Sequence, residues 1–129
     1  MNDFSFETTK SIICQPGAIR QLESLCKQLS IRKPLIVTDP GIMSLNLHKA
    51  ALQSFENASV DCCLYGEVQA DPSDDIVLDA VSVAIREGVD GVIGFGGGSS
   101  MDIAKLVAVL ARSEPVSYTH LTLPTTPYV

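Results

Sequence analysis

The sequence predicts an α/β protein in which helices flank a Rossmann-like parallel sheet. Short apolar runs alternate along the chain with longer amphipathic segments, and these runs carry hydrophobic residues at consecutive positions rather than at every second one. Strands buried on both faces have this continuous pattern, and they occur mainly in parallel sheets covered by helices on both sides. Three glycines directly after the last apolar run indicate a tight strand-to-helix turn.

The first half of the chain supplies two strand–helix alternations. Residues 4–14 alternate loosely and predict an extended segment or a hairpin, while residues 18–29 place apolar side chains at helical spacing. Residues 34–39 predict a short buried strand, which Pro40 and Gly41 should stop. Residues 45–55 then predict a second amphipathic helix, and residues 60–65 predict another strand.

The second half repeats the pattern with clearer boundaries. Ser73 is a typical N-cap for a helix whose apolar stripe runs from Ile76 to Ile85, and Gly88 is a typical helix stop. Residues 89–95 predict a buried strand that runs directly into Gly96, Gly97 and Gly98. Residues 100–112 predict a final helix that is apolar on nearly all sides.

Composition narrows the class of protein. A chain of 129 residues with 46% hydrophobic content fits one domain with a real core. The net charge is −6 and basic residues are scattered, so no basic stripe suits a nucleic-acid backbone. No apolar run approaches the roughly 18 residues of a membrane span, and the first ten residues do not resemble a signal peptide. We expect a cytoplasmic protein that binds neither nucleic acid nor membranes, with four buried reduced cysteines.

The composition changes after Glu114. Residues 116–129 are rich in proline and threonine and carry no Lys, Arg, Asp or Glu. A Pro/Thr-rich linker is one interpretation. The one we favour is that residues 116–126 resemble the translation of a transposase-type sequencing adapter. We therefore expect two parts, an N-terminal dinucleotide-binding part over residues 1–115 and an unstructured tail over residues 116–129.

The glycine run predicts a binding site for an anionic cofactor. Without Cβ atoms, glycines let the backbone approach a ligand closely, and the free N–H groups at the start of the next helix favour a pyrophosphate. Ser99 fits as the N-cap of that helix, with Asp102 in a capping-box-like position three residues later. The alternative is that the glycines form only a turn and Asp102 only caps the helix. The spacing matches neither the usual dinucleotide fingerprint nor a P-loop.

Asp39 is the second candidate binding residue. It ends the strand predicted over residues 34–39, at the edge where open α/β sheets bind ligands. A carboxylate there can accept a hydrogen bond from a ribose 2′-OH and would repel a 2′-phosphate, which favours NAD over NADP. The alternative is that Asp39 forms the turn before Pro40 and Gly41.

Three motifs together resemble iron-containing (group III) alcohol dehydrogenases. They are Val37-Thr-Asp39 after a strand, Asp71-Pro-Ser before a helix, and Gly96-Gly-Gly-Ser-x-x-Asp-x-Ala-Lys105. The resemblance covers residues 3 to about 112. Glycerol dehydrogenases and sugar-phosphate cyclases share the glycines and the aspartate but usually lack the Ala-Lys ending, so they remain alternatives, as does a stand-alone nucleotide-binding domain.

This resemblance implies an NAD-dependent, metal-activated oxidoreductase that acts on a small alcohol or aldehyde and forms a homo-oligomer. Asp39 would bind the adenosine ribose, and the pyrophosphate region would be bound by Gly97, Gly98, Ser99 and Asp102. Asp71 stands where the family usually has Asn, and it is a further candidate cofactor contact.

The metal is implied to be Fe²⁺ or another divalent ion, held by a helical second domain that is missing here. The family's metal ligands, an aspartate and three histidines, would come from sequence beyond this chain, so no catalytic or metal-binding residue is expected in it. Only His48 and His120 are present. We expect His48 to be a surface or half-buried residue and His120 to lie in the tail, and we expect this N-terminal part alone to be inactive.

Overall fold

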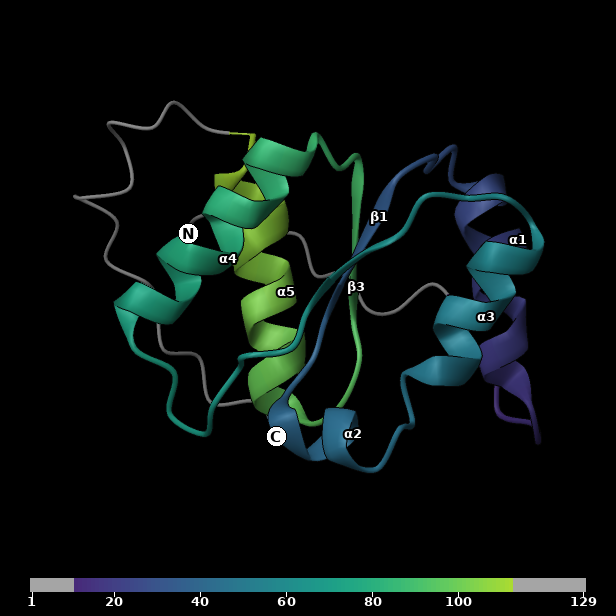
Figure 1. Cartoon of the computed structure of the whole chain (residues 1–129), viewed down its shortest axis with the longest axis horizontal. Helices are drawn as coiled ribbons and strands as arrows, with labels where there is room; N and C mark the ends of the chain where they lie inside the picture. The colour runs from purple at the N-terminus through teal and green to yellow at the C-terminus, as the bar shows by residue number, and fades with distance from the viewer. Residues whose placement is uncertain (1–10, 113–129) are drawn as a thin grey trace, which may run out of the picture.

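The protein has a three-stranded parallel sheet between two layers of helices, as Figure 1 shows. The computed structural model describes residues 11–112. The strands are β1 (Pro34–Val37), β2 (Cys63–Tyr65) and β3 (Gly91–Gly94), in the order β2-β1-β3. The predicted α/β class with a parallel, Rossmann-like sheet is confirmed.

Strand β1 lies at the centre and all four of its residues are buried. Its Leu35 pairs with Cys63 of β2 on one side and with Val92 of β3 on the other. Because successive side chains point to opposite faces of a strand, Leu35 and Val37 enter one apolar core and Ile36 enters another. This is the reason for the unbroken apolar run in the sequence.

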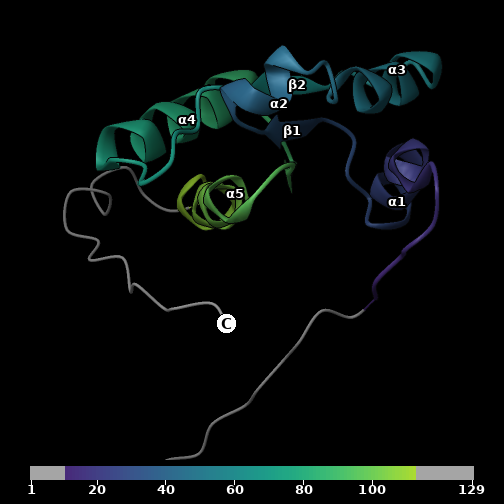
Figure 2. The ribbon, with the colours of Figure 1, turned by 90° about the horizontal axis from the view of Figure 1, so that it is seen from below.

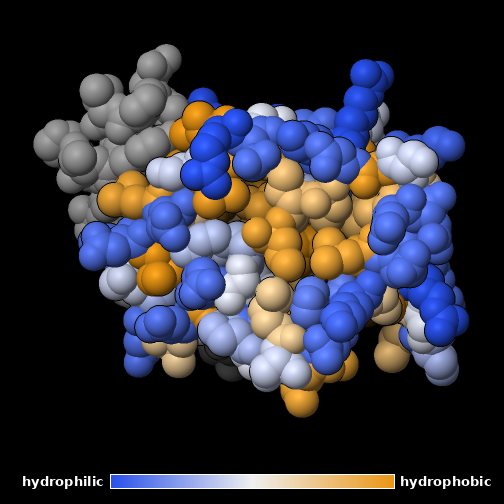
Figure 3. All heavy atoms as spheres, viewed as in Figure 1, coloured by the Kyte–Doolittle hydropathy of each residue, from blue (hydrophilic) through white to orange (hydrophobic). Residues whose placement is uncertain are grey.

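The helices divide between the two faces of the sheet, as the view in Figure 2 also shows. Helices α4 (Asp74–Glu87) and α5 (Gly98–Leu110) pack on the face that carries Leu35 and Val37. The other face is covered by the 3₁₀ helix η1 (Ala18–Gln21), α1 (Leu22–Gln28) and α3 (Lys49–Asn57). In the face seen in Figure 3, apolar atoms gather near the middle and polar atoms lie around them.

One predicted helix starts later than expected. Of residues 45–55, residues 49–55 are helical and belong to α3, whereas a separate short helix, α2 (Pro40–Ser44), precedes them. Proline suits the first helical position, where its missing N–H is not needed, and Asp39 caps the new helix. Asn46, with a φ of 58°, lies in the break between the two helices. Pro40 and Gly41 therefore stop the strand, as predicted, but they start a helix.

The remaining boundaries follow the sequence more closely. Helix α4 starts after Ser73 at the N-cap and ends at Gly88, which adopts the left-handed conformation with a φ of 65°. The helix predicted over residues 18–29 begins as the 3₁₀ helix η1 and continues as α1. It ends at Gln28, one residue before the predicted end. Residues 11–14 form no helix or strand. The predictions on residues 1–10 and on the tail lie outside the described residues.

Candidate functional site

Thr38 joins the carboxyl ends of all three strands. Its backbone N–H donates to the Tyr65 carbonyl (2.8 Å) and its own carbonyl accepts from the Val68 N–H (3.2 Å), which ties β1 to the end of β2. The Thr38 hydroxyl donates to the Phe95 carbonyl at 2.6 Å, just beyond β3. Thr38 is fully buried. The residues that follow the three strands are therefore held at one edge, at the lower end of the sheet in Figure 1.

Asp39 follows Thr38 directly and is half-buried. Its Oδ1 accepts a hydrogen bond from the Ile42 backbone N–H at 2.9 Å and so caps α2. Its Oδ2 accepts a hydrogen bond from the Ser100 hydroxyl at 3.4 Å, across 61 residues of sequence. Asp39 is thus a helix N-cap rather than the turn former of the alternative interpretation, and its second contact places this carboxylate beside the first turn of α5.

The three glycines between β3 and α5 have different environments. Gly96 has a φ of 140°, and a Cβ atom added there would lie 2.8 Å from Asp39 Oδ2, so this position makes room for the carboxylate. A Cβ atom added to Gly97 or Gly98 would meet no atom within 4 Å. These two glycines therefore leave open space in front of α5.

A pocket of about 490 Å³ occupies that space. It is lined by the N-cap and start of α2, the loop after β2 and the start of α5; the residues are Asp39, Pro40, Gly41, Val68, Gln69, Ala70, Gly97, Gly98, Ser99 and Ser100. Asp39 is the one charged residue in this lining. Because the lining offers no Lys or Arg, a bound anion would have to be held by backbone N–H groups.

Helix α5 starts two residues earlier than predicted, and this changes the roles of its first residues. Its N-cap is Gly97 rather than Ser99, and no side chain makes a capping hydrogen bond there. The prediction of Ser99 as N-cap was wrong, because Gly98 already belongs to the helix while Gly97 is still extended. The first backbone N–H groups of a helix have no partner within the helix. Here they face the pocket without a capping side chain.

The structure brings four of the six predicted binding residues together. Asp39, Gly97, Gly98 and Ser99 all line the pocket. Asp71 is exposed in the loop before α4 and Asp102 is half-buried on α5, and neither is part of the lining.

Sequence reasoning missed Ser100 and the loop residues Val68, Gln69 and Ala70. The position of this loop after a strand could have indicated it, because the carboxyl ends of parallel strands share one edge.

His48 is buried, contrary to the prediction of a surface or half-buried position. Its exposed fraction is 7%, and its Nδ1 has no hydrogen-bond partner among the described residues. His48 is the N-cap residue of α3, and the break between α2 and α3 turns it inward. Across residues 11–112, no group of three or more His, Cys, Asp and Glu side chains could hold a metal ion.

The four cysteines are free, as predicted, but they are not all buried. Cys26 is buried, Cys62 and Cys63 are half-buried, and Cys14 is exposed. No helix in the described part is long and apolar enough to cross a membrane.

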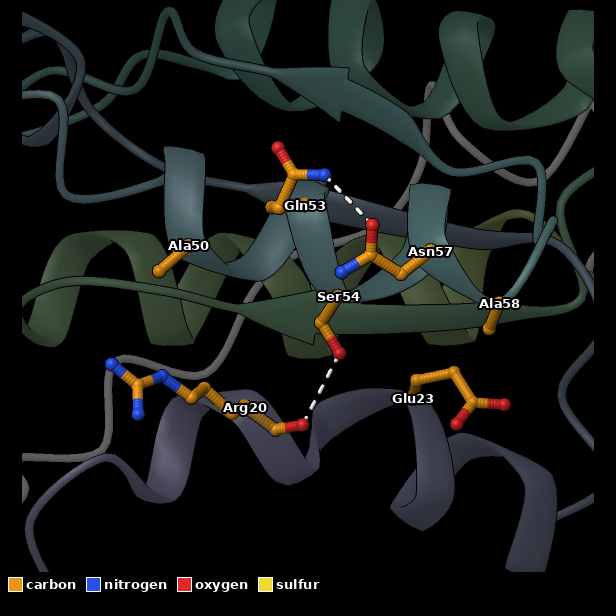
Figure 4. A pocket seen from close by; sticks show the side chains of 7 residues that line it. All are labelled: Arg20, Glu23, Ala50, Gln53, Ser54, Asn57 and Ala58. Atoms are coloured by element: carbon orange, nitrogen blue, oxygen red, sulfur yellow. Dashed lines mark hydrogen bonds between the residues drawn. The ribbon is translucent and has the colours of Figure 1, made fainter.

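A second pocket, of about 500 Å³, lies between α3 and the η1–α1 segment and is shown in Figure 4. Three of its polar side chains, those of Gln53, Ser54 and Asn57, form hydrogen bonds within the protein. The Ser54 hydroxyl donates to the Arg20 carbonyl (3.2 Å), and the Gln53 amide donates to Asn57 Oδ1 (2.9 Å). No glycine lines it. The pocket at the strand ends is therefore the stronger candidate site.

Comparisons of the sequence and of the structure with known proteins point to the same family. Residues 9–127 match the family model of iron-containing alcohol dehydrogenase. A 4-hydroxybutyrate dehydrogenase from Cupriavidus necator is 34% identical over 107 residues, which cover 83% of this chain and 28% of the relative. An NAD-dependent methanol dehydrogenase from Bacillus methanolicus is 34% identical over 97 residues, which cover 75% of this chain and 26% of the relative.

A solved structure has the same fold. The NADH-dependent butanol dehydrogenase A from Thermotoga maritima superposes with a TM-score of 0.75 at 29% identity, over 88% of this chain and 29% of that one. The chain thus spans less than a third of the length of these relatives.

Proposed function

Because the chain belongs to the iron-containing alcohol dehydrogenase family, we propose that it is the dinucleotide-binding part of an NAD-dependent enzyme. The enzyme would transfer hydride between NAD and a small alcohol or aldehyde. This reading is supported by the similarity to an NAD-dependent methanol dehydrogenase and to an NADH-dependent butanol dehydrogenase. The larger part of such an enzyme would be supplied by sequence outside this chain.

The observation that carries the proposal is the open space at Gly97 and Gly98. Packing within the protein does not explain why these positions are glycine, since an added Cβ atom would meet no protein atom within 4 Å. Both lie where the uncapped N-terminus of α5 opens into the pocket. A helix N-terminus offers backbone N–H donors and a partial positive charge, which suit a pyrophosphate. The pocket residues fit this group without any cationic side chain.

Asp39 would select NAD over NADP. Its two oxygens already accept hydrogen bonds from Ile42 and Ser100, but a carboxylate has about four acceptor positions. It can therefore cap α2 and accept a ribose hydroxyl at the same time. Ser99 would contact the pyrophosphate from the first turn of α5, and Asp71 and Asp102 remain weaker candidates because they lie outside the pocket lining.

The described residues do not fit the iron that the family name implies. No set of three suitable ligands occurs among them, so we assign no catalytic step to these residues. We expect the 129-residue chain to bind the dinucleotide without oxidising an alcohol. In the complete enzyme, the metal would polarise the substrate oxygen from the missing helical part.

The test is the affinity of the chain for NADH and NADPH, measured by titration of nicotinamide fluorescence. A charge-assisted hydrogen bond contributes roughly 1.5–3 kcal/mol, and repulsion of a 2′-phosphate adds an effect of similar order. Asp39→Gly should therefore weaken NADH binding modestly, strengthen NADPH binding, and reduce the preference on the order of a hundredfold. Asp102→Ala should weaken the binding of NADH and of NADPH by the same factor. If Asp39→Gly changes both affinities equally, Asp39 is only a turn residue.

A further inference from the structure

Ser100 is a buried hydroxyl that points at Asp39. It lies in the first turn of α5 and is only 1% exposed. A buried hydroxyl without a partner is costly, so the single acceptor recorded for Ser100, Asp39 Oδ2 at 3.4 Å, is significant. Ser99 precedes it in the same turn but is half-buried, and no hydrogen bond of its side chain to Asp39 is recorded.

The Asp39 carboxylate is held by contacts from two helices. Ile42 of α2 fixes Oδ1 through its backbone N–H, and Ser100 of α5 contacts Oδ2. The Asp39 carboxylate packs closely against the backbone of Gly96. A Cβ atom at this position would lie only 2.8 Å from Oδ2, so a larger residue would displace the carboxylate. With Ser100 removed, only the Ile42 contact restrains the carboxylate, and Oδ2 can rotate away from its present position.

We infer that Ser100 is a positioning residue that sharpens the choice between NAD and NADP by holding Asp39 toward the pocket. This inference rests on the proposed function, in which Asp39 faces the 2′ position of the ribose. A fixed carboxylate gives both a well-aligned acceptor for the 2′-OH and a close negative charge against a 2′-phosphate. A rotating carboxylate provides less of each, so both components of the preference decrease together.

The experiment measures the dissociation constants of NADH and NADPH on the full 129-residue chain and its variants. In Ser100→Ala, the ratio of the NADPH constant to the NADH constant should fall roughly three- to tenfold, the effect of one modest hydrogen bond. Ser100→Thr keeps the hydroxyl and should retain most of the ratio. Ser99→Ala is the matched control, since it should weaken both nucleotides and leave the ratio unchanged. If Ser100 has only a structural role, Ser100→Ala should weaken the binding of both nucleotides equally and leave the ratio unchanged.

The outcomes separate the two proposals. If the wild-type chain binds neither nucleotide or shows no preference, the proposed function fails, and this inference fails with it. If Asp39→Gly abolishes the preference while Ser100→Ala preserves it, the proposed function stands and the role of Ser100 is refuted. Ser100→Cys, which keeps the side-chain volume but is a poor donor, replaces Ser100→Ala if that variant does not fold, and it should lower the ratio in the same direction.

Discussion

The four thiols provide a prediction at the scale of single residues. Burial, with smaller contributions from Cys63, Cys26 and Asp61, raises the pKa of Cys62 to about 12. Burial likewise raises the pKa of Cys26 and of Cys63. Because the thiolate is the reactive form, these three thiols should react slowly near neutral pH, whereas the exposed Cys14 should react quickly.

The measurement is mass spectrometry after brief treatment with iodoacetamide. One fast modification at Cys14 is expected; Cys14→Ser should remove it, and denaturant should make the remaining cysteines react. Labelling of Cys62 as fast as that of Cys14 would contradict the burial of Cys62.

Asp90 gives a prediction with a defined pH dependence. Its carboxylate accepts hydrogen bonds from the backbone N–H groups of Arg32 (2.9 and 3.1 Å) and Lys33 (2.7 Å). Slight burial alone would raise its pKa, but these hydrogen bonds outweigh burial, so the pKa is lowered in the folded protein. The stabilisation is therefore present above the unfolded pKa of about 4 and is lost as the pH falls through the lower folded value.

Asp90→Asn should lower the free energy of unfolding by about 1 kcal/mol near neutral pH, a modest value because the carboxylate is exposed. The difference from wild type should shrink below about pH 4. Thermal melts across pH check this, with Asp61→Asn as control, since the Asp61 carboxylate is exposed and its ion pair with Lys33 should contribute little. A difference that stays constant with pH would exclude the Asp90 carboxylate as the source.

At the scale of the elements, we predict opposite effects on stability for alanine substitutions at two glycines. Gly94 lies where β3 meets α5, and an added Cβ would lie 3.0 Å from both the Met101 Cα and the Ala104 Cβ. Gly94→Ala should force the helix and strand apart and cost about 1–3 kcal/mol. Gly98→Ala adds its methyl group to open space in the first turn of α5, where alanine favours the helix by up to about 1 kcal/mol.

Thermal melts and NADH titrations of both variants distinguish these roles. Gly94→Ala should lower the melting temperature, whereas Gly98→Ala should keep or raise it and weaken NADH binding at least about tenfold by occupying the pyrophosphate space. Normal NADH binding by Gly98→Ala would place the nucleotide elsewhere.

Most elements could be predicted from the sequence, because each has a local signal. The apolar run of β1 and the Ser73 and Gly88 boundaries of α4 are examples. Helix α2 could not be predicted, because Pro40-Gly41 after a strand is equally typical of a turn. In the folded chain, the hydrogen bond from the Ile42 N–H to Asp39 caps α2 and favours the helix over a turn.

The site was predictable only in part. Asp39 and the glycines have a sequence signal, but the difference between Ser99 and Ser100 depends on where α5 begins. A shift of one residue rotates a helix by about 100°, so it decides which serine forms a hydrogen bond with Asp39. Sequence periodicity does not locate a helix start that closely.

At the scale of the whole molecule, we predict self-association. Strand β3 is at the edge of the described sheet, and the adjacent α5 exposes Met101 and Val109 at 49% and 62%. An unpaired strand edge beside exposed apolar side chains promotes contact between copies. Light scattering after size-exclusion chromatography should show a mass above that of one chain, increasing with concentration. Met101→Lys should reduce it, whereas a sharp monomer peak for wild type would refute the prediction.

The molecular class was predictable but the arrangement of its strands was not. Alternating apolar and amphipathic segments predict a parallel sheet with two helical layers, which the structure has. The order β2-β1-β3 depends on pairing between distant segments, such as the bond from Thr38 to Phe95, and no local pattern encodes it.

The central place of β1 has a consequence for biosynthesis. Thr38 emerges from the ribosome 57 residues before Phe95, the partner of its hydroxyl. At about 5–20 residues per second, the interval between the two is roughly 3–11 seconds. Leu35, Ile36 and Val37 are all fully buried in the finished fold, but they have no neighbouring strand until β2 emerges. From then until β3 emerges, β2 is their one strand neighbour in the described sheet. The apolar side chains of β1 are therefore incompletely covered until nearly all of the described residues have been synthesised.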